Sequence, residues 1–194
     1  MIVKADIEIS NMNSQTISYS LFYGSLVDLD PKLILRLYEY QHALGSSAIF
    51  IPRILTFECP TCPEDIKRQH CISDGSFCFT PPSEEKAQMY PELSDYQLIK
   101  ENLRELCIYD YIGDLTDEWD MHVFFNYLYN MQFVCLTSDR QLTDECAERV
   151  MYDLDIDAMA INSCMKTSFD SYDDWDSYNS LFERDRDSAN DLGI

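Results

Sequence analysis

The chain is poor in glycine, in basic residues and in long apolar runs. Only 5 of its 194 residues are glycine, and no glycine-rich phosphate-binding loop occurs, so nucleotide binding is disfavoured. With 14 basic and 35 acidic side chains, the formal net charge is −21, which disfavours nucleic acid and anionic lipid surfaces as partners. No stretch reaches the roughly 20 apolar residues of a membrane span. The expected partners are therefore proteins or peptides, basic ones above all.

The N-terminus carries no sign of secretion. Residues Met1 to Asp6 lack the continuous apolar core of a signal peptide. No Asn-x-Ser/Thr acceptor for N-glycosylation occurs anywhere in the chain. Entry into the secretory pathway would therefore need a leader outside this sequence or another route.

Cysteine, by contrast, is abundant. The chain has eight: Cys59, Cys62, Cys71, Cys78, Cys107, Cys135, Cys146 and Cys164. An even number of cysteines is typical of disulfides formed in an oxidising compartment. Zinc would need a second closely spaced ligand pair beside Cys59 and Cys62, and the sequence has none. We therefore expect four structural disulfides in the secretory or endosomal lumen or outside the cell; the alternatives are a zinc site and a redox pair at Cys59 and Cys62.

The first third of the chain has the pattern of a βαβ unit. Loose alternation of apolar residues predicts two strands within residues 2–22. Asp30 followed by Pro31 is typical of a helix start, and Gly45 is typical of a helix end. The apolar run 48–57 predicts a central strand buried on both faces. Strand, helix, strand and then Cys-x-x-Cys is the order of a thioredoxin-like βαβ unit.

The predicted helix after Pro31 has one apolar face. Leu33, Leu37, Tyr40 and Leu44 recur on this face at helical spacing.

The rest of the chain divides into a cysteine-rich loop, a helical part and an acidic tail. Proline and turn residues predict that segment 60–91 is a loop and not the core of a helix. Helices are expected to begin near Leu93, to span Trp119 to Phe133, and to follow Thr143 and Ala158. From residue 167 the composition predicts a largely irregular surface tail, with Trp175, Leu181 and Phe182 as anchors. The expected parts are 1–92, a thioredoxin-like portion; 93–166, a disulfide-stapled helical subdomain; and 167–194, an acidic tail.

Five short elements resemble the central lumenal region of plant-type vacuolar sorting receptors. Gln69 to Cys78 contains Cys-Ile-Ser-Asp-Gly-Ser-Phe-Cys, similar to the family's Cys-Ile-Asn-x-Gly-Arg-Tyr-Cys. Glu101 to Cys107 reads Glu-Asn-Leu-Arg-Glu-Leu-Cys, close to Glu-Asn-Leu-Arg-Gln-Leu-Cys. The other three elements are Phe57-Glu58-Cys59-Pro60, Asp144-Glu145-Cys146-Ala147-Glu148, and Leu154-Asp155-Ile156-Asp157 followed by Cys164-Met165. Their order and spacing are shared across roughly residues 20–194.

The resemblance implies an α/β fold with a thioredoxin-like portion and an inserted disulfide-stapled helical region. It also implies a lumenal protein that helps to bind the sorting signals of soluble cargo. The family's thioredoxin-like part continues with further strands beyond the point reached by Asp191 to Ile194. We therefore expect an incomplete sheet, either because the chain is a fragment or because a partner completes the sheet by strand addition.

Local pairing is the favoured disulfide arrangement among the 105 that eight cysteines allow. It joins Cys71 to Cys78, which enclose a short turn, and Cys135 to Cys146, which bracket a joint between helices. The remaining pairs are then Cys107 with Cys164 and Cys59 with Cys62.

The other chemically suggestive clusters are expected to be structural. Asp153, Asp155 and Asp157 have the spacing of a calcium loop, but Ala158 replaces its glycine and Cys164 its glutamate. The acidic cluster 170–176 is expected to be solvated. His42, His70 and His122 lie far apart in sequence and have no nucleophile motif near them. We expect no cofactor and no metal.

The sequence thus predicts a non-catalytic lumenal or extracellular protein-binding module that resembles the cargo-binding region of vacuolar sorting receptors. One alternative is a structural subunit of a larger assembly whose partner completes the sheet. The other is a thiol-disulfide oxidoreductase with Cys59 as nucleophile and Cys62 as resolving thiol.

Overall fold

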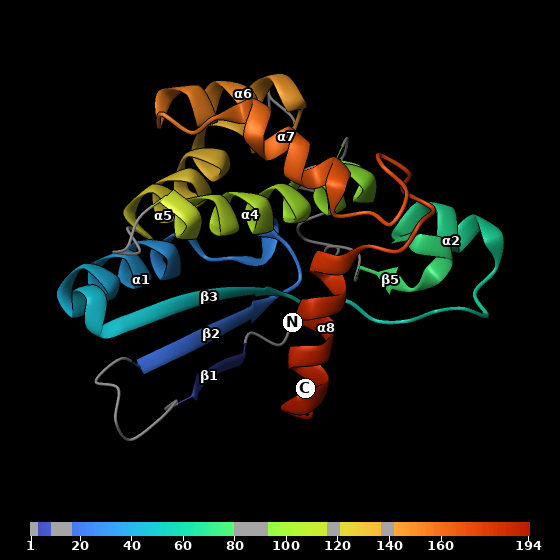
Figure 1. Cartoon of the computed structure of the whole chain (residues 1–194), viewed down its shortest axis with the longest axis horizontal. Coiled ribbons are helices and arrows are strands. Elements are labelled where there is room, and N and C mark those ends of the chain that lie inside the picture. Colours follow the sequence, from blue (N-terminus) through green and yellow to red (C-terminus); the bar gives the residue numbers. More distant parts are fainter. Residues whose placement is uncertain (1–3, 9–16, 80–92, 116–120, 137–141) are drawn as a thin grey trace.

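The computed structural model describes residues 4–8, 17–79, 93–115, 121–136 and 142–194, and arranges them in layers (Figure 1). A three-stranded sheet forms the first layer. Helices α1 (Pro31–Leu44), α4 (Asp95–Leu115) and α5 (Met121–Asn130) lie along one face of this sheet. Helices α6 (Asp144–Asp153) and α7 (Ala158–Thr167) lie on the side of α4 and α5 away from the sheet.

The sheet has the order β1-β2-β3. Strand β1 (Lys4–Glu8) pairs antiparallel with β2 (Ile17–Tyr23), and β2 pairs in parallel with β3 (Ala48–Ile54). Between β2 and β3 the chain makes the 3-10 turn η1 (Leu26–Asp28), helix α1 and the 3-10 turn η2 (Gly45–Ser47). The predicted strand-helix-strand unit is therefore confirmed.

Strand β3 differs from its prediction, since it is not a central strand buried on both faces. Its residues alternate between buried and half-buried, and within the described residues it pairs only with β2. An edge position suits Pro52, which has no N–H to donate. The apolar run is continuous because α1, α4 and α5 cover one face while the other face is only partly exposed.

The outer edge of β3 is largely closed to further pairing. In a parallel strand, alternate residues turn their N–H groups away from the neighbouring strand. On this edge, Ala48 N–H donates to the Gly45 carbonyl, Pro52 has no N–H, and Ile54 N–H donates to Asp185 Oδ2 at 2.8 Å. Few amides therefore remain free on this side of β3.

Helix α1 begins and ends as predicted, but a different face is buried. Asp30 caps it by accepting a hydrogen bond from Lys32 N–H, and Gly45 ends it with φ +53°. Ile34 and Gln41 are its buried residues, whereas Tyr40 is 62% exposed and Leu44 48%. The apolar face of Leu33, Leu37, Tyr40 and Leu44 is thus only partly covered. The helix turns Gln41 inward instead, where its side chain accepts from Tyr19 Oη and donates to the Ala48 carbonyl.

The cysteine-rich segment, predicted to be a loop and not the core of a helix, contains one short surface helix among its described residues. Helix α2 (Glu64–His70) is followed by the small hairpin of β4 (Cys71–Ile72) and β5 (Phe77–Cys78), with the 3-10 turn η3 (Ser73–Gly75) at its tip. No residue of α2 is buried, so this helix does not belong to the core. Residues 80–92 of the predicted loop lie outside the described residues.

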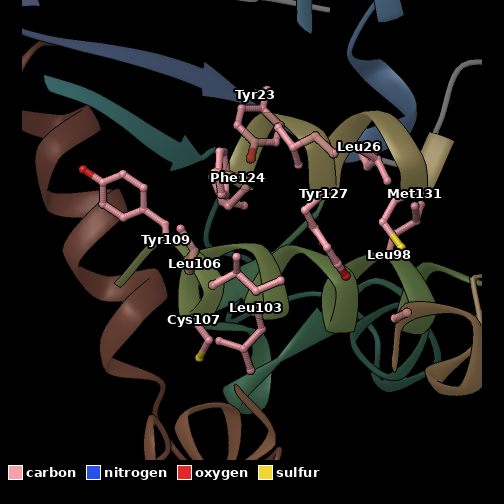
Figure 2. Close-up of a cluster of buried hydrophobic side chains, with 14 of the residues drawn as sticks. Tyr23, Leu26, Leu98, Leu103, Leu106, Cys107, Tyr109, Phe124, Tyr127 and Met131 are labelled. Atoms are coloured by element: carbon pink, nitrogen blue, oxygen red, sulfur yellow. The ribbon is translucent and has the colours of Figure 1, made fainter. Parts of the chain in front are cut away.

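The helical part confirms the predicted segments. Helix α5 continues into a π-helical turn, η4 (Met131–Cys135), and Thr143 caps α6 by accepting from Cys146 N–H. Figure 2 shows apolar side chains of α4 and α5 packed together, with Tyr23 and Leu26 from the sheet side. Within the predicted helix 119–133, Trp119 lies outside the described residues. The buried side chains there include Met121, Phe124, Phe125, Leu128 and Met131.

The C-terminal segment is not the largely irregular tail that its acidic composition predicted. Residues Ser180–Asp191 form helix α8, which Asn179 caps by accepting from Leu181 and Phe182 N–H. Helix α8 lies beside the end of β3 (Figure 1), and its Phe182 and Asp185 are fully buried. Helix α8 has polar residues on one face and buried anchors on the other. Composition alone therefore predicted an irregular tail. Phe182 was correctly expected to hold this segment to the body.

Within the described segments, every helix is too short or too polar to span a bilayer.

Candidate functional site

All eight cysteines are paired in disulfides. The bonds are Cys59–Cys62, Cys71–Cys78, Cys107–Cys164 and Cys135–Cys146. The bond between Cys107 and Cys164 joins α4 to α7, and the bond between Cys135 and Cys146 joins η4 to α6. These two bonds hold the outer helical layer to the inner one.

The Cys59–Cys62 disulfide closes a tight turn between β3 and α2. Cys62 N–H donates to the Cys59 carbonyl, and Cys59 N–H donates to the Gly75 carbonyl at 2.8 Å. A Cβ on Gly75, whose φ is +89°, would come within 2.8 Å of the Cys59 carbonyl oxygen, so only glycine fits at this contact. Both sulfurs lie in partly exposed residues, and the helix that follows begins with Glu64 and Asp65. These carboxylates disfavour a negatively charged thiolate at this turn and so weaken it as a nucleophile.

The most strongly charged cluster of the interior lies on α4, at the element Glu101 to Cys107. Glu101, Asn102, Arg104 and Glu105 are all buried, as is Tyr127 of α5. Tyr127 Oη donates to Glu101 at 2.6 Å, and Arg104 donates to the other oxygen of Glu101 and to Asp144 of α6 at 2.6 Å. Hence this element, which carries much of the family resemblance, connects the two helical layers from inside the protein.

Glu105 is the least well satisfied member of this cluster. Tyr23 Oη donates to its Oε2 at 2.6 Å, while its Oε1 is buried and has no hydrogen-bond partner among the residues that the structure describes. Burial, followed by the nearby Glu101, raises the pKa of Glu105 well above its usual range, although Tyr23 and Arg104 act in the opposite direction. Burial together with Glu105 likewise raises the pKa of Tyr23. A protonated Glu105 therefore suits this environment better than a carboxylate.

A second buried carboxylate fastens α8 to the sheet. Asp185 accepts from Ile54 N–H and from Arg53 Nη1, at 2.8 and 2.9 Å. Burial raises its pKa in spite of these bonds and of the charge on Arg184. Because both carboxylate oxygens are used within the fold, Asp185 is a structural group.

A polar cleft of about 520 Å³ lies at the outer helical layer. Four segments form it: the start of α4, the helices α6 and α7, and the loop between α7 and α8. Its lining side chains are Tyr96, Lys100, Asp144, Glu148, Asn162, Met165, Lys166, Asp173 and Trp175. A cleft of this size with aromatic, apolar and charged walls is suited to holding a few residues of a peptide.

The aromatic wall of the cleft is fixed by the surrounding fold. The rings of Tyr96 and Trp175 have centroids 5.2 Å apart, and Trp175 also contacts Phe169 at 4.9 Å. The Trp175 carbonyl accepts a hydrogen bond from Ser73 N–H at 3.0 Å, which ties the loop after α7 to the small hairpin. The cleft therefore depends on Trp175, which the sequence predicted only as an anchor of the tail.

Most charges of the cleft are paired with one another. Asp144 accepts from Lys100 and Arg104, both at 2.6 Å; although partial burial acts in the opposite direction, these bonds lower the pKa of Asp144. Lys166 lies 3.3 Å from Asp173. Glu148 is exposed and, among the described residues, has only the amide of Asn162 as a hydrogen-bond partner, at 3.3 Å. Glu148 is therefore the carboxylate of the cleft that remains available to an incoming cation.

Two of the acidic residues singled out in the sequence have structural tasks. Asp157, from the set with calcium-like spacing, caps α7 by accepting from Met159 and Ala160 N–H. Asp174, from the acidic cluster 170–176, accepts from Asp176 N–H in the loop after α7. In the described part of the chain, no three His, Cys, Asp or Glu side chains come together as a metal site would need.

The histidines are not all as separate as their sequence positions suggest. The ring of His122 lies edge-on between Tyr38, at 4.6 Å, and His42, at 5.1 Å. His70 pairs with Asp95 at the start of α4. No sequence motif indicated either contact, because each joins segments that only the fold brings together.

Comparison with known proteins agrees with the family resemblance seen in the sequence. A family model described as the vacuolar sorting receptor thioredoxin-like domain matches residues 32–191. Vacuolar-sorting receptor 4 of Arabidopsis thaliana is 30% identical over 124 residues, which cover 62% of this chain and 19% of that protein. Vacuolar-sorting receptor 1 of Pisum sativum is 28% identical over a stretch of the same length and coverage. The matched stretch thus spans about a fifth of the length of these relatives.

Proposed function

Because this chain belongs to the family of vacuolar sorting receptor thioredoxin-like domains, we propose that it is a non-catalytic protein-binding module whose peptide site is the cleft between α4, α6 and α7. The relatives are vacuolar-sorting receptors by name, and a receptor holds a ligand. The observation that carries the proposal is the cleft itself, since it combines a fixed aromatic wall with charged groups at the surface.

We also place the module in an oxidising compartment, the secretory or endosomal lumen or the extracellular space. Four disulfides in one chain of this size are typical of such compartments and rare in the cytosol. The names of the relatives, which are vacuolar-sorting receptors, agree with the secretory or endosomal lumen.

The proposal is tested by selecting binders from a random peptide library with the oxidised chain as bait. Each selected peptide is then measured against Asn162→Trp, which fills the cleft from α7, where Asn162 is half-buried. Glu39→Trp, at an exposed position of α1, is the matched control. We expect peptides that bind the wild type and the control but bind the cleft-filled variant at least about tenfold more weakly, a loss of about 1.4 kcal/mol.

Two results would contradict the proposal. One is that no peptide is enriched over a bait-free selection. The other is that selected peptides bind Asn162→Trp as tightly as Glu39→Trp, which would place the binding surface elsewhere. Circular dichroism of both variants, with retained helix content, ensures that a loss of binding does not reflect unfolding.

Thiol-disulfide exchange at Cys59 and Cys62 is a second candidate, favoured by the partly exposed position of this disulfide. The acidic start of α2 counts against a reactive thiolate at this place. Reduction of insulin by the dithiol form is the assay. A wild type without activity, or a Cys59→Ser protein with full activity, excludes an oxidoreductase.

A structural subunit whose partner completes the sheet is the remaining alternative. The scarcity of free amides on the outer edge of β3 counts against strand addition on that side. Analytical ultracentrifugation separates this alternative from the proposed binding module, because a cooperatively folding monomer supports a self-contained module.

A further inference from the structure

We infer that Tyr172 is an acceptor for enzymatic O-sulfation, a modification that converts its phenol into a sulfate ester. Tyr172 belongs to the acidic cluster 170–176 and lies in the loop between α7 and α8 (Figure 1). Such a site goes beyond the proposed binding module and rests on only one part of that proposal, the placement of the chain in the secretory lumen.

The side chain of Tyr172 is exposed and its hydroxyl is not engaged by the fold. The residue is 67% exposed, and its ring lies with its centre 5.9 Å from Lys166 Nζ. Its hydroxyl makes no hydrogen bond within the part of the chain that the structure describes. By contrast, the hydroxyl of Tyr178 in the same loop accepts from Arg186 and donates to Glu183. An enzyme can therefore reach the hydroxyl of Tyr172 without breaking a hydrogen bond of the fold.

The backbone around Tyr172 forms a tight turn in a closed surface loop. Asp174 N–H donates to the Ser171 carbonyl at 3.0 Å, so the central residues of the turn are Tyr172 and the residue after it. A backbone bridge between Phe169 and Asn179 closes the base of the loop. Surface loops held in this way by a rigid scaffold are the usual places for functional residues. The fold thus presents this tyrosine where a second protein can approach it.

The sequence around Tyr172 is purely acidic in its charged residues. In the stretch 167–177, which is centred on Tyr172, there is no lysine or arginine, and the acidic residues are Asp170, Asp173, Asp174 and Asp176. A sulfotransferase needs basic side chains around its active site, because its donor, phosphoadenosine phosphosulfate, is a multiply charged anion. An acidic substrate segment is complementary to such a surface and is steered toward it. The charge around Tyr172 therefore suits this class of enzyme.

A second exposed tyrosine provides an internal comparison. Tyr152 is 81% exposed and is followed by Asp153. It lies in helix α6, however, and Arg149 stands three residues before it, on the same side of the helix. The positive charge opposes a basic enzyme surface, and the helix keeps the flanking backbone groups in its own hydrogen bonds. Tyr172 is therefore the favoured acceptor of the two.

The reaction needs only the donor and the enzyme. The phenol oxygen of Tyr172 attacks the sulfur of phosphoadenosine phosphosulfate, and the bond from this sulfur to the bridging phosphate oxygen breaks. Adenosine bisphosphate leaves with the electron pair of that bond, and a base of the enzyme takes the phenol proton. The product carries one additional negative charge. Enzymes of this class act in the secretory lumen, the compartment proposed above for a chain with four disulfides.

The test uses the oxidised chain, a purified tyrosylprotein sulfotransferase and radiolabelled phosphoadenosine phosphosulfate. Incorporated label is measured for the wild type, for Tyr172→Phe and for the control Tyr152→Phe, and mass spectrometry of the digested chain locates the sulfate. We expect the wild type and Tyr152→Phe to be labelled alike, and Tyr172→Phe to stay at the level found without enzyme. Circular dichroism confirms that both variants are folded.

Two double variants test the acidic neighbours. Asp170→Asn with Asp173→Asn removes two charges beside Tyr172. The matched control, Asp153→Asn with Asp155→Asn, removes two charges beside the comparison tyrosine and leaves the chain with the same net charge. At low salt the first double variant should be labelled about tenfold more slowly than the wild type, as expected when complementary charge steers an encounter. The control should be labelled at the rate of the wild type.

Three results overturn the inference: a wild type without label, a Tyr172→Phe protein labelled as strongly as the wild type, and an equal fall in rate for the two double variants. The synthetic peptide of residues 167–177 is labelled in parallel. If the peptide accepts sulfate and the chain does not, the folded loop is not a substrate; if neither accepts it, the sequence is not recognised. None of these results bears on the cleft, whose own test is the loss of peptide binding in Asn162→Trp.

Discussion

Removal of the disulfide between Cys107 and Cys164 is expected to cost the fold more than removal of any other. This bond spans 57 residues of sequence, whereas the bond between Cys59 and Cys62 spans 3. A crosslink stabilises the native state mainly by restricting the unfolded chain, and the restriction grows with the logarithm of the loop length. The loop-entropy relation gives about 4 kcal/mol for the long loop and about 1.6 kcal/mol for the short one.

The assay is chemical denaturation of the oxidised proteins, followed by circular dichroism. The double variant Cys107→Ala with Cys164→Ala is compared with Cys59→Ala with Cys62→Ala, which removes the same number of sulfur atoms. We expect the first to lose about 4 kcal/mol of the free energy of unfolding and the second about 1.6 kcal/mol. Cys107 is also fully buried in the core between α4 and α7, so the loss of packing at this site adds to the difference.

Equal losses in the two double variants, or a larger loss for the short loop, would refute this reasoning. Such a result would mean that the bond between α4 and α7 does not set the stability of the helical layers. The shape of the cleft would then not depend on it.

Three further changes test individual contacts. The pKa of Glu105 is raised in the folded state, so the wild type loses stability as pH rises above the pKa of this group in the unfolded chain. The free energy of unfolding of Glu105→Gln should therefore gain on that of the wild type by about 1.4 kcal/mol per pH unit from about pH 4.3 up to the folded pKa. Below about pH 4.3 there should be no such gain. Denaturation at pH 4 and at pH 7 measures this gain, and an unchanged difference between the two would contradict it. Phe182→Ala should lose about 3 to 5 kcal/mol of unfolding free energy, since this ring is fully buried; a loss below about 1 kcal/mol would show that α8 is not part of the folded unit. Gly75→Ala should lower the thermal midpoint, as its Cβ would collide with the Cys59 carbonyl at 2.8 Å; unchanged melting in calorimetry would contradict this contact.

Features set by neighbours in sequence could be predicted from the sequence. Asp30 and Thr143 cap the helices that follow them because their side chains reach the N–H groups two or three residues ahead. The parallel pairing of β2 and β3 follows from the length of the helix between them, which carries the chain back to the same end of the sheet. Such signals are local, so a single sequence contains them.

Features that depend on distant segments could not be predicted. Helix α8 appears acidic and irregular in sequence, yet it is held by Phe182 and by Asp185, which binds the backbone of β3 more than a hundred residues earlier. The edge position of β3 and the inward turn of Gln41 likewise depend on which elements pack against them.

The cleft is the clearest case of this limit. Its walls come from the start of α4, from two later helices and from Trp175, and none of these segments contains a binding motif. The sequence contained one signal, a tryptophan within an otherwise polar segment, and this signal indicated packing and not a binding site.

The central claim is that the cleft between α4, α6 and α7 is where this module holds a peptide. Chemical-shift mapping tests it most directly, by titration of the ¹⁵N-labelled oxidised chain with a peptide selected from the random library. The account predicts that the largest shifts fall on the amides of Lys100, Glu148, Lys166 and Trp175 and their neighbours. Shifts concentrated on α1, or at Cys59 and Cys62, would contradict it.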